Sequence, residues 1–211
     1  MRIAVIGRGN VGSALARKWV EAGHVVIFGV RDPSSPEKQG EARVLGGDLA
    51  SIADAAPGAE VVVLAVPWIA VPDALAAAGN LAGKVLLDCT NPLSADISSL
   101  VVAGSTSGGE QVAAMAPGAR VVKIFNTTGS SNMLAPRYGE TPITMFYAGD
   151  DVAAKETAAA LSRDVGFEPV DAGGLTAARL LEPLALLWIS LAYRQKMGPD
   201  FALILARRPA S

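Results

Sequence analysis

A glycine-rich hexapeptide between an apolar run and a helical pattern constrains the fold of this chain more than any other feature. The hexapeptide, Gly7–Gly12 (GRGNVG), directly follows the apolar run Ile3–Ile6. It opens the segment 10–22, in which apolar residues recur at helical spacing, and a second apolar run, Val25–Val30, comes next. This order of strand, glycine turn and helix is the context that a dinucleotide-binding fingerprint requires. The sequence therefore predicts the first βαβ unit of a Rossmann-type sheet.

Each glycine of this motif has its own expected task. Gly7 allows the tight turn after the strand, Gly9 lets the backbone approach a pyrophosphate, and Gly12 lets the helix pack closely on the strand. The pyrophosphate is expected at the helix N-terminus, where free N–H groups and the helix dipole favour an anion. The predicted pyrophosphate site consists of Gly7, Arg8, Gly9, Asn10, Val11 and Gly12. The alternative is a glycine-rich turn that binds no ligand.

Apolar runs alternate with helical patterns as far as about residue 171. The predicted strands are Ile3–Ile6, Val25–Val30, Val61–Val66, Val85–Asp88, Val121–Phe125, Ile143–Ala148 and a weaker Glu168–Asp171. Helical patterns cover residues 10–22, 48–56, 69–78, 107–115 and 151–165. Because strands and helices alternate at this spacing, we expect an α/β fold, a Rossmann-type doubly wound parallel sheet with right-handed crossovers. Two segments rich in turn residues, 31–40 and 104–109, are expected to be mobile loops.

The alternation stops after the last predicted strand. Residues 174–197 form one long helical pattern, and residues 201–207 are expected to form one more short helix. We therefore expect a dinucleotide-binding domain over residues 1–172 and a helical C-terminal extension over residues 173–211. The extension is expected to pack on the sheet, bordering the active-site cleft, or on a second subunit.

The composition excludes several classes of protein. Eighteen Lys and Arg against twenty Asp and Glu give a net charge of −2, which argues against nucleic acid or a membrane surface as partner. Hydrophobic residues make up 51% of the chain, which excludes disorder. The longest apolar stretches, Val61–Val71 and Leu184–Ala192, are shorter than the ~18–20 residues that span a bilayer. With no signal-peptide pattern and a single cysteine, Cys89, a cytoplasmic location is expected.

The end of the second predicted strand favours NADP over NAD. An NAD-binding protein usually places Asp or Glu there to bind the ribose 2′-hydroxyl. Here Arg31 follows the strand and can pair with a 2′-phosphate, while Ser34, Ser35 and Lys38 can add donors. Asp32 would repel a phosphate if it pointed inward, and the alternative is that Arg31 and Asp32 form a solvated loop pair. We expect Arg31 and Ser34 to hold the 2′-phosphate.

The usual acid–base residues are missing from the predicted cleft. The only histidine, His24, lies at the edge of the sheet away from ligands and is expected to be structural. The sequence has no metal-ligand cluster and no nucleophile motif. Hydride transfer between two stacked rings needs only positioning, so we expect no catalytic side chain and no metal. The predicted border of the nicotinamide and its acceptor is Val66, Pro67, Trp68, Asn91, Pro92, Asn126 and Thr127. The alternative for each of these is a simple role in a turn.

Seven short pieces of sequence carry a resemblance to a known family. They are Ile6–Gly12, Ala22–His24, Gly29–Arg31, Ala65–Trp68, Val122–Thr127, Asp171–Gly173 and Leu181–Leu184. In this order, over nearly the whole chain, they resemble the NADPH-dependent coenzyme F-420 (F420 below) reductases and their bacterial relatives. The phosphate-binding residues of that family carry over to Arg31, but Val30 and Asp32 stand where its best-known members have Ser and Arg. The Phe-Asn-Thr piece also resembles the cytoplasmic domain of the metalloreductases, which pass electrons from NADPH to a flavin.

The resemblance implies a specific activity. It predicts an enzyme, an oxidoreductase that transfers a hydride between NADP(H) and coenzyme F420, a deazaflavin stacked on the nicotinamide, in a protein that is a homodimer. Exposed basic residues are then expected to meet the phosphate and glutamate tail of F420, and the candidates are Arg137, Arg194, Lys196, Arg207 and Arg208. Two alternatives stay open. One is an NADPH-dependent reductase of the same fold for a flavin, a quinone or a small carbonyl, and the other is a non-catalytic NADP sensor.

Overall fold

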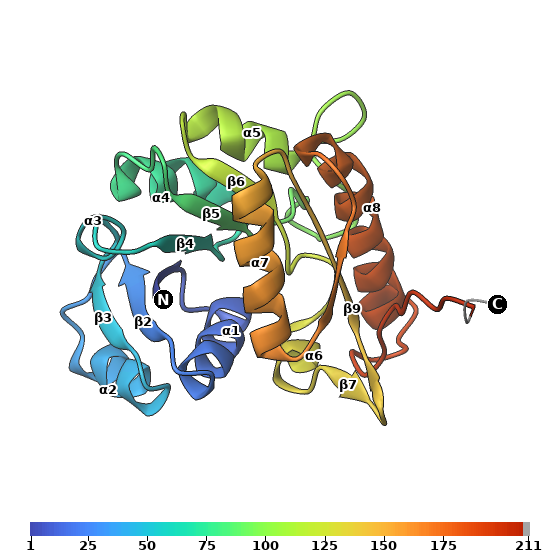
Figure 1. Cartoon of the computed structure of the whole chain (residues 1–211), viewed down its shortest axis with the longest axis horizontal. Helices are drawn as coiled ribbons and strands as arrows, with labels where there is room; N and C mark the ends of the chain where they lie inside the picture. Colours follow the sequence, from blue (N-terminus) through green and yellow to red (C-terminus); the bar gives the residue numbers. More distant parts are fainter. Residues whose placement is uncertain (209–211) are drawn as a thin grey trace.

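One eight-stranded sheet, with the strand order β10-β9-β6-β5-β4-β1-β2-β3, forms the centre of the computed structural model, which describes residues 1–208 (Figure 1). Its strands are β1 (Arg2–Ile6), β2 (Val25–Val30), β3 (Asp48–Ser51), β4 (Val61–Leu64), β5 (Val85–Asp88), β6 (Arg120–Lys123), β9 (Thr144–Gly149) and β10 (Glu168–Asp171). Neighbouring strands are parallel except β6 and β9, which pair antiparallel. The predicted doubly wound α/β fold is confirmed, with this one antiparallel junction as an exception to the expected parallel sheet. A separate hairpin, β7 (Arg137–Tyr138) and β8 (Thr141–Pro142), was not predicted.

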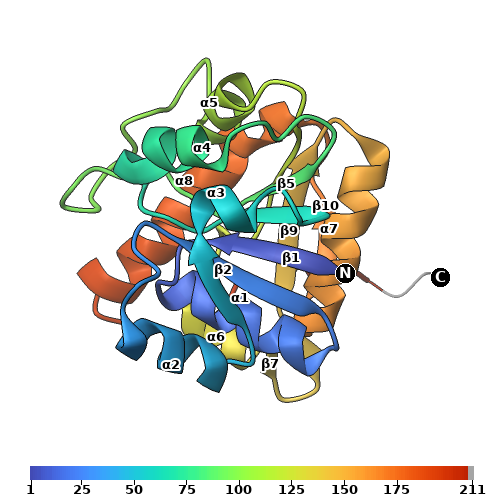
Figure 2. The ribbon, with the colours of Figure 1, turned by 90° about the vertical axis from the view of Figure 1, so that its left-hand side faces the viewer.

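Helices cover both faces of the sheet. Figure 2 shows α3, α4 and α5 on one side of β1 and α1, α2 and α6 on the other. The helices are α1 (Asn10–Glu21), α2 (Pro36–Val44), α3 (Ile52–Ala55), α4 (Val71–Ala78), α5 (Gly108–Met115), α6 (Ser130–Leu134), α7 (Val152–Val165) and α8 (Ala178–Ile189). Short 3-10 turns η1 (Trp68–Ala70) and η2 (Leu175–Ala177) precede α4 and α8, and the π-helical turn η3 (Ser190–Arg194) follows α8.

The central strands are buried on both faces, which explains their unbroken apolar sequences. In β1, Ile3 and Val5 pack in one core cluster together with Trp19 of α1. The alternate residues Ala4 and Ile6 pack in the second cluster, on the opposite face. Side chains of a strand point alternately to the two faces, so a strand between two helical layers needs an apolar residue at every position.

Two local predictions were wrong near β3, the strand at one edge of the sheet. Residues 48–56 were expected to form a helix, but Asp48–Ser51 form the edge strand β3, and only Ile52–Ala55 are helical. Ser51 ends the strand and caps the helix, since its Oγ accepts a hydrogen bond from Asp54 N at 3.1 Å. The expected mobile loop 31–40 ends earlier, because α2 begins at Pro36 with Ser35 as its N-cap. The second expected loop ends at α5, which begins at Gly108.

The C-terminal part contains the predicted long helical run, from Leu175 to Arg194, but lacks the predicted short helix over 201–207. That segment is extended and is held by backbone groups: Leu205 N donates to Thr144 Oγ1 at 2.9 Å, and Phe201 O accepts from Trp188 Nε1 at 3.0 Å. By length and composition the run 175–194 is long and apolar enough to cross a membrane, with a mean hydropathy of 1.5. The sequence predicted this helical continuity but gave a shorter apolar stretch, 184–192, than the apolar helix that the structure contains. The last residues of the predicted extension, 209–211, lie outside the described residues.

His24 lies where it was expected, at the amino edge of the sheet just before β2. Its ring nitrogens lie 3.1 Å from the Met1 amino group and 2.9 Å from Asp164 Oδ2. It therefore joins the chain start to α7, far from the carboxyl ends of the strands.

Candidate functional site

A cleft of about 780 Å³ opens at the carboxyl ends of β1, β2 and β4. Because the chain builds the sheet outward from β1 first through β2 and β3, and then through β4 and β5 on the other side, this is a topological switch point. Ligands of open α/β sheets bind at such points. The lining residues are Gly7, Arg8, Gly9, Gly29, Val30, Arg31, Asp32, Lys38, Ile52, Ala65, Val66, Pro67, Ala70, Asp73, Ala74 and Ala77.

The three glycines of the fingerprint differ in their surroundings, and two of them are required by close backbone contacts. Gly7 has a φ of +102°, and a Cβ there would lie 2.4 Å from the Ala65 carbonyl oxygen. A Cβ on Gly12 would lie 2.1 Å from the Gly7 carbonyl oxygen, so the first turn of α1 can approach the strand only without a side chain. A Cβ on Gly9 would meet nothing within 4 Å, because the space beside it is the open cleft.

The N-terminus of α1 faces this open space without a side-chain cap. Gly9 is its N-cap residue, and no acidic side chain lies in the first turn. The helix has 12 residues, so its free N–H groups and dipole give this end a partial positive charge. Asn10 is exposed at the first helical position, whereas Val11 packs against the core and Gly12 is buried. Asn10, Val11 and Gly12 can therefore contribute backbone groups, while Gly7, Arg8 and Gly9 line the cleft itself.

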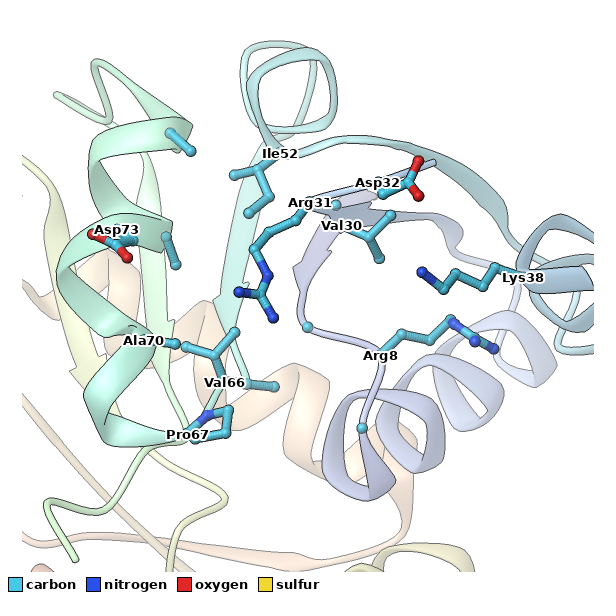
Figure 3. A pocket seen from close by; sticks show the side chains of 16 residues that line it. Arg8, Val30, Arg31, Asp32, Lys38, Ile52, Val66, Pro67, Ala70 and Asp73 are labelled. Carbon is cyan, nitrogen blue, oxygen red and sulfur yellow. The ribbon is translucent and has the colours of Figure 1, made fainter. Parts of the chain in front are cut away.

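Cationic side chains gather at the end of β2. Figure 3 shows the Arg31 guanidinium and the Lys38 amine directed into the cleft, whereas the Asp32 carboxylate points away from Arg31. Asp32 is held in that direction by Ser34, whose hydroxyl and backbone N–H both donate to Asp32 Oδ1, at 2.5 and 3.0 Å. These bonds lower the pKa of Asp32, so it stays ionised, but its charge is turned from the space beside Arg31. Arg8 also lines the cleft and forms an ion pair with Glu41 of α2.

A second group of predicted residues lies outside this cleft, beside α5 and α8. Asn126 Nδ2 donates to Asn91 Oδ1 at 3.0 Å and to the Leu181 carbonyl at 3.2 Å, and Asn91 Nδ2 donates to the Asn126 carbonyl at 2.9 Å. Asn126 Oδ1 is buried and has no hydrogen-bond donor among residues 1–208. Phe125, the preceding residue, has a φ of +61°, a strained conformation for a bulky side chain, which turns the chain into this network.

The remaining members of the predicted nicotinamide border take different positions. Val66 and Pro67 line the cleft, and Trp68 lies at the start of η1. The Trp68 ring and Pro92 both approach Gly108, since a Cβ there would lie 3.2 Å from each. Thr127 is buried, and its Oγ1 lies 3.9 Å from the Met145 sulfur. The structure thus brings Trp68, Pro92, Asn91 and Asn126 to one region and places Thr127 in the core beside them.

A fully buried ionic cluster lies directly beneath this region and was missed by the sequence analysis. Lys123 Nζ lies 2.9 Å from Asp88 Oδ2, 2.8 Å from Glu182 Oε1 and 2.6 Å from the Thr90 carbonyl. The Lys123 and Asp88 side chains are 0% exposed, and that of Glu182 is 1% exposed. A signal existed in the sequence, because Lys123 interrupts a predicted buried strand, and Lys is almost never fully buried unless it is paired.

The charges of this cluster are balanced by backbone groups. Burial alone would lower the pKa of Lys123, but the Asp88 and Glu182 carboxylates outweigh it and raise that pKa above its usual value. The second carboxylate, Glu182, accepts hydrogen bonds from Gly108 N and Gly109 N, both at 2.9 Å. These are the first N–H groups of α5, so the helix N-terminus offsets the extra negative charge.

Other sequence signals lead to no reactive group. Among the described residues, no three His, Cys, Asp or Glu side chains are arranged to hold a metal ion. Cys89 is free and buried, and burial, together with the charge of Asp88, raises the pKa of its thiol well above the usual range. Asp73 of α4 lines the cleft and was not predicted, since an Asp in the first turn of a helix is common for reasons of stability alone.

Comparisons with known proteins place this geometry in a family. A family model described as NADP oxidoreductase, coenzyme F420-dependent, matches residues 2–92. The F420-dependent NADP reductase of Methanothermobacter thermautotrophicus is 33% identical over 215 residues, which cover 93% of this chain and 91% of that protein. A solved structure from Arthrobacter sp. FB24, described as a candidate F420-dependent NADP reductase, superposes with a TM-score of 0.88 and 37% identity over 98% of this chain and 100% of that chain.

A second group of relatives is longer. Metalloreductase STEAP3 of Rattus norvegicus is 31% identical over 192 residues, which cover 88% of this chain but only 37% of that protein. The fold and the fingerprint are thus shared with proteins of different length. The match to the F420-dependent NADP reductase, in contrast, extends over nearly the whole of both chains. The chain therefore belongs to the family of coenzyme F420-dependent NADP oxidoreductases, as its sequence resemblance predicts.

Proposed function

We propose that this NADP-linked oxidoreductase transfers a hydride between NADP(H) and coenzyme F420. One observation carries the proposal: the cleft at the switch point combines an uncapped helix N-terminus with two inward-directed cations, Arg31 and Lys38. An anion-binding helix end and a separate cationic group match the pyrophosphate and the 2′-phosphate of NADP. The acceptor follows from the relative in Methanothermobacter, whose name states dependence on F420.

The pyrophosphate is proposed to lie beside Gly9. The open space there is where a Cβ would stand, and Gly7 and Gly12 bring strand and helix close enough to form that space. Backbone N–H groups of the first turn of α1 would donate to the phosphate oxygens, which agrees with the predicted site of Gly7, Arg8, Gly9, Asn10, Val11 and Gly12.

The 2′-phosphate is proposed to bind Arg31, with Lys38 as a second cation. Ser34 would act indirectly, because its hydroxyl already donates to Asp32 and holds that carboxylate away from Arg31. This arrangement supports NADP binding even though Asp32 stands where the best-known family members have Arg. Arg8, paired with Glu41, would line the cleft between the 2′-phosphate site and α1.

The nicotinamide is proposed to lie against Val66, Pro67 and Trp68, with its edge toward Asn91, Pro92, Asn126 and Thr127. The buried Asn126 Oδ1 supports this placement, since it has no donor among the described residues and the carboxamide N–H of a nicotinamide would satisfy it. Bound NADPH would supply the hydride, the deazaflavin ring of F420 would accept it, and a proton from solvent would complete the reduction of the ring. The protein would hold the two rings with their reacting carbons ~3–3.5 Å apart and exclude water, so no catalytic side chain is required.

The C-terminal residues from 173 onward are proposed to border the acceptor side of this cleft, next to a dinucleotide-binding part formed by residues 1–172. They carry exposed apolar side chains, which are Leu180, Leu187, Tyr193 and Met197. Leu180 and Leu187 are seven positions apart on α8 and so share one face of it, and this exposed apolar surface supports a homodimer that pairs through α8. The enzyme is further proposed to be cytoplasmic, in line with its free, buried Cys89.

The decisive assay mixes the purified protein with NADPH and F420 and follows loss of the visible absorbance of the deazaflavin. NADH replaces NADPH in one control, and a flavin replaces F420 in another. Rapid bleaching that requires NADPH supports the proposal. NADPH binding without bleaching would contradict it.

The likeness to metalloreductase STEAP3 favours one second candidate, an NADPH-dependent reductase that acts on a flavin. Reduction of the flavin in the parallel control, without bleaching of F420, would identify that activity.

A further inference from the structure

The buried cluster beneath the strand ends belongs to a closed circuit of contacts. Starting at Lys123, the circuit passes to the Thr90 carbonyl at 2.6 Å, and from the adjacent Asn91 to Asn126 through two hydrogen bonds of 2.9 and 3.0 Å. From Asn126 it passes to the Leu181 carbonyl at 3.2 Å, and the next residue, Glu182, returns to Lys123 at 2.8 Å.

This circuit joins three elements that are far apart in the sequence. Thr90 and Asn91 follow β5, Lys123 ends β6 with Asn126 three residues later, and Glu182 belongs to α8. Asp88 strengthens the β5 corner, because its Oδ1 accepts from Thr90 N and Thr90 Oγ1 at 2.9 and 2.7 Å. The charged side chains of Lys123, Asp88 and Glu182 are all buried. They can therefore act on a ligand only through the residues that they hold in place.

We propose that Lys123, Glu182 and Asp88 are positioning residues that fix the Asn91 and Asn126 amides, and with them the nicotinamide-binding edge of the site, against helix α8. The inference rests on the proposed function in one respect, the location of the nicotinamide beside Asn91 and Asn126. It assigns the cluster a role in orienting the ring, in addition to fold stability. Glu182 also holds Gly108, against which the Trp68 ring packs, so both sides of the proposed ring site depend on the same carboxylate.

The charge pattern explains why an ionic cluster suits this task. The Asp88 and Glu182 carboxylates contact the Lys123 ammonium in fixed directions, and two N–H groups of α5 donate to the Glu182 carboxylate from its other side, so each charged group has partners at hydrogen-bond distance. A buried charge that loses its partner is strongly destabilised, so alternative arrangements of the strand ends are unfavourable. An apolar contact would permit sliding of α8 over β6, whereas these directional bonds do not.

The test compares the binding of two ligands, NADP⁺ and 2′-phospho-ADP-ribose, which lacks only the nicotinamide ring of NADP⁺. The first variant, Glu182→Gln, keeps a carbonyl oxygen for one of the two α5 N–H groups and removes the charge that faces Lys123. We expect about a tenfold loss of NADP⁺ affinity and about twofold or less for 2′-phospho-ADP-ribose, measured by isothermal titration calorimetry. The kcat with F420 should fall by more than the rise in KM for NADPH, as for a misplaced ring.

A matched control and a second variant complete the design. Arg179→Gln breaks the Arg179–Glu110 pair, which joins the same helices α8 and α5 at the surface with contacts of 2.8 and 2.5 Å, and should leave both affinities unchanged. The double variant Asp88→Asn/Lys123→Met removes the other side of the cluster and leaves Glu182 on its two backbone donors. It should reproduce the selective loss, and it provides the answer if Glu182→Gln does not fold.

Three results would overturn the inference: an equal loss for both ligands in both variants, no loss for either ligand, or a wild type that binds both ligands with equal affinity. The calorimetry needs no acceptor, so it remains informative if F420 is not reduced. Conversely, the wild type could reduce F420 while the variants keep the wild-type difference in affinity between NADP⁺ and 2′-phospho-ADP-ribose. That result would contradict only the role of the cluster.

Discussion

The side chain of Asn126 donates to Asn91 Oδ1 at 3.0 Å, and the side chain of Asn91 donates back to the Asn126 carbonyl at 2.9 Å. The two residues are 35 positions apart and follow neighbouring strands, β5 and β6. Because each amide bonds to the other residue, the two strand ends are fixed in register beyond the sheet itself. A flat ligand ring at this edge would therefore meet a surface that is already ordered before binding, which lowers the entropic cost of binding.

Replacement of Arg31 by Ala is expected to weaken NADPH binding by roughly 1.5–3 kcal/mol, because a charge-assisted hydrogen bond to the 2′-phosphate is lost. NADH lacks that phosphate, so its binding should change little. Fluorescence titration with both nucleotides measures the difference. Lys38→Met should show the same selectivity, whereas Glu37→Gln, on the same helix but outside the cleft lining, is the control. An equal loss for NADPH and NADH would mean that Arg31 stacks or packs and does not read the phosphate.

Two alanine substitutions within the fingerprint are expected to differ in kind. Gly12→Ala places a Cβ 2.1 Å from a backbone oxygen, so the free energy of unfolding should fall by about 1–3 kcal/mol or more. Gly9→Ala has open space and an ordinary φ of −80°, so stability should stay unchanged while NADP binding is lost to the methyl group in the pyrophosphate space. Urea unfolding and NADP⁺ titration of both variants test this. A Gly9→Ala protein with unimpaired NADP⁺ binding would exclude the proposed position of the pyrophosphate.

The outer face of α8 is expected to form the homodimer interface. Leu187 is 50% exposed in the single chain, and Leu187→Asp should remove roughly 1.5–3 kcal/mol of association free energy by placing a charge in an apolar contact. Sedimentation equilibrium measures the shift toward monomer. Val44→Asp is the matched control, since Val44 is an 87% exposed apolar residue on α2, away from this face. If the wild type is already monomeric, the proposed dimer is wrong.

Acid stability should depend on the surface pair of Glu110 and Arg179. The hydrogen bond and charge of Arg179 lower the pKa of Glu110 to about 2, below its ordinary value of 4.5. A lowered folded-state pKa contributes stability that is fully present above 4.5 and is lost as the pH falls toward 2. In Glu110→Gln that contribution is absent, so the melting temperature should fall less steeply with acid than in the wild type. Identical slopes in the two proteins between pH 4.5 and 2 would contradict the assignment.

The sequence predicted those elements whose pattern is complete within one short segment. The bounds of β2, β5 and β10 agree with the predicted runs. In β2 and β5 the signal is a mostly apolar, mostly buried run, whereas β10 is exposed at both ends and gives a weaker signal. Asp48–Ser51 was misread as helix, since the segment pairs only at the sheet edge and its polar ends fit either structure. The extended course of residues 201–207 depends on hydrogen bonds to Thr144 and Trp188, which local sequence does not show.

The features of the candidate site likewise fall into two groups, those that local sequence shows and those that depend on the tertiary structure. The glycine fingerprint and Arg31 were identifiable from the sequence, because backbone approach and charge placement follow from residue type and spacing along one βαβ unit. The direction of the Asp32 carboxylate, the orphan oxygen of Asn126 and the cluster of Lys123, Asp88 and Glu182 were decided by the tertiary structure. Glu182 is 59 residues from Lys123 in the sequence, and only the packing of α8 on the sheet brings the two charges within 2.8 Å. Pairing between distant charges has no local pattern, since burial and partner are both properties of the folded chain.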